Sequence, residues 1–149
     1  MTSEHKPPVR GFRATFVAIG VLYVALASSM LVRGVGVMRD FAVPEDVIHA
    51  PVFRDFFSFF YELMAAQGVL IALFGQLVRE RRSQAWVALV LCVWNVYVTW
   101  RDLSTSDSPL GNQLYRGTAT LIPVFLDLSF ALVFAGYAWA AWRPARGTR

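Results

Sequence analysis

The sequence predicts an all-α integral membrane protein: a four-helix antiparallel bundle with both termini in the cytoplasm, formed as one domain over residues 1–149. Three observations predict this class. Hydrophobic residues make up 56% of the chain and charged residues only 16%, which is too apolar for a soluble domain of this length. The charged residues lie between four long apolar runs, each long enough to cross a bilayer as a helix. Lysine and arginine are also distributed unevenly between the two sets of connections, which is typical of multi-pass membrane proteins.

The four predicted spans cover residues 14–32, 56–78, 85–101 and 117–142. The first has no charged residue between Arg13 and Arg33, and at about 1.5 Å per residue it matches the hydrocarbon core of a bilayer. Small residues in this span, Gly20 among them, permit close contact with another helix. Because the run is too long for the apolar part of a signal peptide, we expect an uncleaved first helix.

The connections differ in length and character. Residues 33–55 form the longest one, in which Pro44 starts a short amphipathic helix at the interface and Pro51 ends it or restarts the next helix. This segment also carries His49, which we expect at the surface. Residues 79–84 form a tight basic turn, and residues 103–116 form a polar loop with turn signals.

Orientation follows from the basic residues. Nine of the 14 lysines and arginines lie in the N-terminal segment, the basic turn and the C-terminal tail, and five lie in the other two connections. The first group therefore faces the cytoplasm, and the protein is multi-pass in the cell membrane if its source is prokaryotic. The same topology signal accounts for the net charge of +4, so we expect the lipid bilayer, and no nucleic acid, as a partner.

Few polar side chains lie at spanning depth, and they define the candidate site. Glu62, Asn95 and Asp127 are expected at a similar depth in the half of the bilayer away from the cytoplasm. An ionisable group there costs roughly 2.5–3.5 kcal/mol on insertion scales, so it usually faces a bundle interior. Because they are seven residues apart, Glu62, Val69 and Gln76 share one helical face.

A carboxyl group in an apolar cavity can hold a proton at neutral pH, and two in one cavity can act as acid and base. We therefore predict Glu62 and Asp127 as catalytic acid and base, with Asn95 orienting them. Aromatic faces nearby can stabilise a cation, and a basic side chain can anchor a ligand head group. The predicted substrate-binding residues are Tyr61, Gln67, Trp94, Tyr97, Trp100, Arg101 and Asp102. Such a site suits a double-bond shift, a cyclisation or an epoxide opening in a lipophilic molecule.

A resemblance to a known family rests on the order of these features. It covers about residues 57–139: Glu62 in the run FFYELMAAQG, a short basic turn, the Trp94-Asn95-Val96-Tyr97 pattern, a polar loop with Leu-Gly and Leu-Tyr pairs, and a polar residue in the upper half of the last span. This order resembles the EXPERA family of four-helix membrane proteins, of the emopamil-binding sterol isomerase and sigma-2 receptor type. The resemblance implies that acidic residues shift a double bond through a carbocation. Glu62 would match one family acid, and Asp127 stands where that family has an amide. Small membrane-embedded terpene cyclases offer a second analogy.

Two other functions are compatible with the same residues. A non-catalytic lipid- or sterol-binding protein, or a small subunit of a membrane complex, would use Glu62, Asn95 and Asp127 as hydrogen-bonded anchors of helix register. A proton-coupled transporter would use the two carboxyls as a relay and would require a homodimer. The sequence contains no nucleotide, zinc-protease or thiol-redox motif, and its one cysteine is Cys92. We therefore expect neither a cofactor nor a metal.

Overall fold

The computed structural model describes residues 7–41, 43–105 and 121–143. Four long helices within these ranges are long and apolar enough to cross a membrane: α1 (Phe12–Arg33), α3 (Pro51–Leu77), α4 (Arg81–Thr105) and α5 (Leu121–Trp142). The predicted all-α architecture with four spans is confirmed, and the chain is a multi-pass membrane protein. Most of the predicted polar loop and the start of the last span, residues 106–120, lie outside the described residues.

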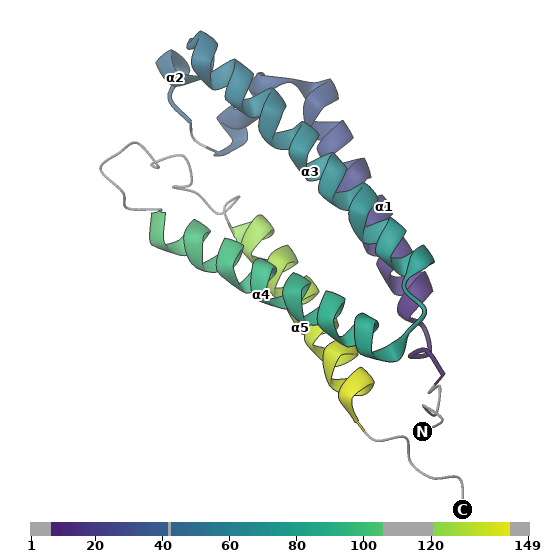
Figure 1. Ribbon diagram of the computed structural model, residues 1–149. Coiled ribbons are helices and arrows are strands. Elements are labelled where there is room, and N and C mark those ends of the chain that lie inside the picture. The colour runs from purple at the N-terminus through teal and green to yellow at the C-terminus, as the bar shows by residue number, and fades with distance from the viewer. Residues whose placement is uncertain (1–6, 42, 106–120, 144–149) are drawn as a thin grey trace, which may run out of the picture.

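The four helices are arranged as two pairs, with α1 packed on α3 and α4 packed on α5 (Figure 1). The pairs converge where α1 begins, α3 turns into α4 and α5 ends, and they diverge toward the opposite end. Of the nine basic residues that predict a cytoplasmic location, the six within the described part of the chain lie at the convergent end: Arg10, Arg13, Arg79, Arg81, Arg82 and Arg143.

The α1–α3 pair depends on glycines that bring the two backbones into contact. A Cβ atom on Gly20 would lie 2.7 Å from the backbone nitrogen of Ala72, and one on Gly68 would lie 2.7 Å from the carbonyl oxygen of Gly20. About two turns further along α3, a Cβ atom on Gly75 would lie 2.8 Å from the Cβ of Phe16. Close approach at small residues is the usual way in which helices associate within a membrane.

Another face of α1 forms the hydrophobic core with α4 and α5. Phe16 meets Phe134 of α5 edge-on at 5.2 Å between ring centroids, and Tyr23 meets Phe130 at the same distance. The buried cluster comprises Phe12, Phe16, Ile19, Tyr23, Ile71, Ala88, Leu91, Phe130, Phe134 and Ala138. Every long helix contributes, and α1 contributes most, so α1 links the two pairs.

Side-chain hydrogen bonds tie the helix ends together where the pairs converge. Arg81, at the start of α4, donates to the carbonyl oxygens of Ala140 and Ala141 at 2.6 and 3.0 Å. Gln84 accepts a hydrogen bond from the Val9 amide at 2.8 Å and donates to the carbonyl oxygen of Val78 at 3.1 Å. These bonds satisfy backbone groups that a helix end otherwise leaves without partners.

The first connection folds as a 3₁₀ helix, η1 (Val35–Phe41), followed by α2 (Glu45–His49). Pro51 occupies the first turn of α3, where its missing N–H costs nothing, so the prediction that Pro51 restarts a helix is confirmed. The Arg39 guanidinium donates two hydrogen bonds to Glu45, at 2.6 and 2.9 Å. The predicted surface position of His49 is also confirmed: it is exposed, with Nε2 3.3 Å from the same carboxylate.

We predict that Gly68→Ala lowers the thermal stability of the protein in detergent, because the added Cβ meets the backbone of α1. Overpacking of this kind typically costs about 1–3 kcal/mol. The matched control is Gly136→Ala, since a Cβ on Gly136 meets nothing within 4 Å. Equal melting temperatures for the two variants would contradict the close α1–α3 contact.

The Arg39–Glu45 pair predicts a pH dependence. The hydrogen bonds from Arg39 hold the pKa of the Glu45 carboxyl below its ordinary value. A group with a depressed folded-state pKa stabilises the fold above its unfolded pKa and loses that effect as the pH falls through the folded value. At pH 6, Glu45→Gln is therefore expected to melt at a lower temperature than the wild type. This difference should disappear in acid. It should be small, since the pair is exposed; a difference that grows in acid would contradict the assignment.

Candidate functional site

The buried face of α4 changes from apolar to polar in its second half. Ala88 and Leu91 are apolar, whereas Asn95, Thr99 and Asp102 follow on the same face at spacings of four and three residues. Asn95 is 1% exposed and donates from Nδ2 to the carbonyl oxygen of Leu91 at 2.7 Å; Thr99 is buried and donates to the carbonyl oxygen of Asn95 at 2.9 Å. The polar stretch lies in the half of α4 that runs toward the divergent end of the bundle (Figure 1).

Tyr23 extends this polar stretch to α1. Its hydroxyl donates to Oδ1 of Asn95 at 3.1 Å, and the hydroxyl group and the amide are both buried. The phenol ring packs against Phe130 of α5. Tyr23 is not among the site residues predicted from the sequence; the available signal was the single tyrosine in the middle of the first span.

Asp127 brings a carboxyl group from α5 to the same place. It precedes Phe130 by three residues and Phe134 by seven, so it lies on the helix face that packs into the core. The half-buried Asp127 carboxyl interacts electrostatically with Tyr23 of α1 and with Asp102 of α4. Arg101 in turn interacts electrostatically with Asp102. We call the set Tyr23, Asn95, Thr99, Asp102 and Asp127 the inner polar cluster.

Glu62 lies elsewhere. It is exposed and precedes the buried Ile71 by nine residues, which is two and a half turns and places the two side chains on opposite faces of α3. The prediction that Glu62 faces the bundle interior is therefore wrong, because Gly68 and Gly75 set which face of α3 packs on α1. The structure brings together Asn95 and Asp127, through Tyr23, and leaves Glu62 apart from them.

The predicted substrate-binding residues are similarly divided. Asp102 belongs to the inner polar cluster, and Gln67 is half-buried on α3. Tyr61 is half-buried, with its ring 4.8 Å from that of Phe57. The remaining four, Trp94, Tyr97, Trp100 and Arg101, are exposed on α4. Trp94, Tyr97 and Trp100 form a ladder with successive ring centroids 6.0 Å apart, so any ligand of these rings would approach from outside the bundle.

Among the described residues, no group of three or more His, Cys, Asp or Glu side chains is arranged to hold a metal ion. The inner polar cluster itself offers carboxyl, amide and hydroxyl groups. A pair of nearby carboxyls can exchange one proton with a bound molecule, and the neighbouring aromatic rings can stabilise positive charge.

In comparisons with known proteins, no protein-family model, curated protein or solved structure matches this chain.

We predict that the hydrogen bond between Tyr23 and Asn95 couples α1 to α4. In a double-mutant cycle of Tyr23→Phe and Asn95→Ala, the two losses of unfolding free energy should be non-additive by about 1 kcal/mol, the range found for buried hydrogen bonds between membrane helices. The control cycle pairs Asn95→Ala with Tyr137→Phe, because the Tyr137 hydroxyl bonds Thr15 instead. A coupling no larger than the control would contradict the contact.

Proposed function

We propose that the protein is an isomerase or cyclase of the cell membrane that acts on a lipophilic substrate, of sterol, terpenoid or polyketide type. Asp102 and Asp127 would form the acid–base pair. The observation that carries this proposal is that both carboxyls are half-buried on the core-facing sides of two helices that pack on each other, α4 and α5. Asp102 replaces Glu62 in the scheme, because Glu62 is exposed on the opposite face of α3 from the core.

In the proposed reaction one carboxyl group donates its proton to a carbon–carbon double bond, and the adjacent carbon becomes a carbocation. The other carboxylate then removes a proton from a neighbouring carbon, and the electrons of that C–H bond form a new double bond. In a cyclisation, a second double bond attacks the cation before the proton is lost. The product has the same composition as the substrate, and one proton has moved between the two carboxyls.

The other cluster members have supporting roles in this proposal. The rings of Tyr23 and Phe130, which pack together with centroids 5.2 Å apart, can stabilise a passing cation. Asn95 fixes the Tyr23 hydroxyl. The resemblance to EXPERA proteins implies carbocation chemistry of this type, but the acid that it matches is Glu62 and not Asp102.

A second candidate is a non-catalytic lipid-binding protein or a subunit of a membrane complex. One observation favours it: every buried side-chain nitrogen or oxygen among the described residues has a hydrogen-bond partner. Polar side chains that all have hydrogen-bond partners can have a purely structural role, which is to fix the helices in register.

The test expresses the wild type, Asp102→Asn, Asp127→Asn and Glu62→Gln in cells that lack the gene, at matched levels of folded protein. Lipid extracts are compared without a chosen target. We expect the wild type and Glu62→Gln to convert one lipophilic compound into an isomer of the same mass, and both Asp variants to lose at least about 100-fold of that conversion, as is typical when an acid–base group is removed. Unchanged conversion in the Asp variants, or no new isomer with the wild type, would refute the proposal. Lower melting temperatures without any lipid change would favour the second candidate.

A further inference from the structure

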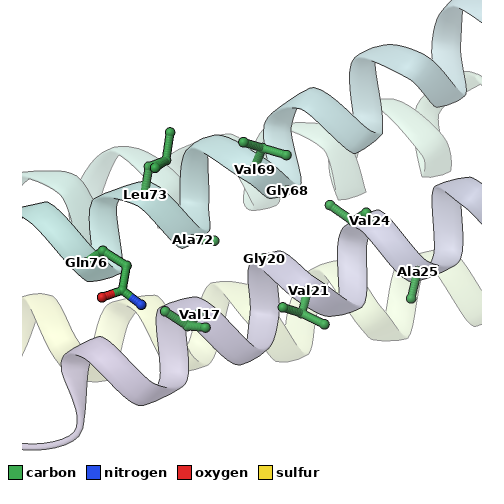
Figure 2. A pocket seen from close by; sticks show the side chains of 10 residues that line it. All are labelled: Val17, Gly20, Val21, Val24, Ala25, Gly68, Val69, Ala72, Leu73 and Gln76. Atoms are coloured by element: carbon green, nitrogen blue, oxygen red, sulfur yellow. The ribbon is translucent and has the colours of Figure 1, made fainter.

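An apolar groove of about 390 Å³ runs between α1 and α3 (Figure 2). Five residues from each helix line it, and only Gln76, at one end, has a polar side chain. The lining extends from Val17 to Ala25 on α1, which is about 12 Å along a helix and somewhat less than one leaflet of the roughly 30 Å hydrocarbon core.

The groove opens away from the bundle core. Its rim residues Val21 and Val69 are 60% and 49% exposed, whereas Tyr23 and Ile71, which face α4 and α5, are 6% and 1% exposed. In Figure 2 the ribbons of α4 and α5 lie behind the groove. A molecule in the groove would therefore come from the surrounding bilayer and would not touch the inner polar cluster.

Two arginines, Arg13 and Arg79, lie in the chain close to the end of the groove marked by Gln76. Arg13 precedes Val17 by one turn of α1, and its carbonyl oxygen is 3.1 Å from the Cβ position of Gly75, the neighbour of Gln76. Arg79 follows Gln76 by three residues and lies two residues beyond the end of α3. Both arginines are exposed, while the nearby Glu80 accepts a hydrogen bond from Ser83.

We propose that this groove binds an anionic phospholipid of the cytoplasmic leaflet. One acyl chain would lie between α1 and α3, the phosphate would lie against Arg13 and Arg79, and the Gln76 amide would donate to an ester or phosphate oxygen. The order of apolar wall, amide and cations along the groove matches the order of chain, ester and phosphate in such a lipid.

A second copy of the chain fits this groove less well than a lipid. Two copies in one membrane are related by an axis along its normal, so each would place Arg13 and Arg79 at the same height. The four cations would repel one another at the contact. A lipid phosphate instead supplies the charge that complements the arginines.

The test uses the purified full-length protein in nanodiscs, with native mass spectrometry and melting temperature as readouts. Phosphatidylglycerol is compared with phosphatidylcholine of the same chains. We expect the wild type to retain phosphatidylglycerol preferentially and to melt at a higher temperature with it. The double variant Arg13→Gln/Arg79→Gln should lose roughly five- to thirty-fold of this preference, while Arg54→Gln, an exposed arginine near the start of α3, should keep it.

A second variant separates the head group from the chain. Val21→Phe/Val69→Phe fills the groove from its exposed rim, so it should weaken retention of phosphatidylglycerol while Arg13 and Arg79 stay in place. The inference is overturned if the wild type retains both lipids equally, if the arginine variant keeps the preference, if filling the groove changes nothing, or if mass spectrometry shows a dimer that these variants dissociate. None of these outcomes depends on catalytic turnover, so the result is separate from that of the proposed function.

Discussion

The two-sided packing of α1 is the constraint on which the rest of the structure depends. One side has glycine backbone in contact with the backbone of α3, and the other carries the aromatic rings that pack against α5. Because α1 contributes to both interfaces, a rotation of this helix would break the glycine contact and withdraw Tyr23 from Asn95 together. The position of Tyr23 relative to Asn95 therefore follows from how α1 meets α3.

The bilayer explains why the inner polar cluster is compact. Hydrogen bonds within a membrane have no competing water, so polar side chains gather where they can satisfy one another. Asn95 and Thr99 each bond a carbonyl of their own helix, and Asn95 also accepts from Tyr23. Beside these fixed groups lie the half-buried carboxyls of Asp102 and Asp127. A rigid support of this kind is what acid–base chemistry requires.

The architecture could be predicted from the sequence because spanning length, apolarity and the distribution of arginines are local properties. The restart at Pro51 was predictable for the same reason. The orientation of Glu62 could not be predicted in this way. A seven-residue repeat shows which residues share a helix face, but it does not show whether that face points into the bundle or outward. Gly68 and Gly75 are also seven apart, and contact with α1 selected their face. Tyr23 was missed because its role depends on Asn95, 72 positions later in the chain.

The central claim is that Asp102 and Asp127 both face the bundle interior while Glu62 stays outside, and thiol cross-linking tests it most directly. In a background with Cys92 replaced by Ser, the pairs Asp102→Cys/Asp127→Cys and Glu62→Cys/Asp127→Cys are treated in membranes with a short bifunctional thiol reagent. The account predicts efficient intramolecular cross-linking of the first pair and none of the second. Cross-linking of the second pair with no reaction of the first would contradict it.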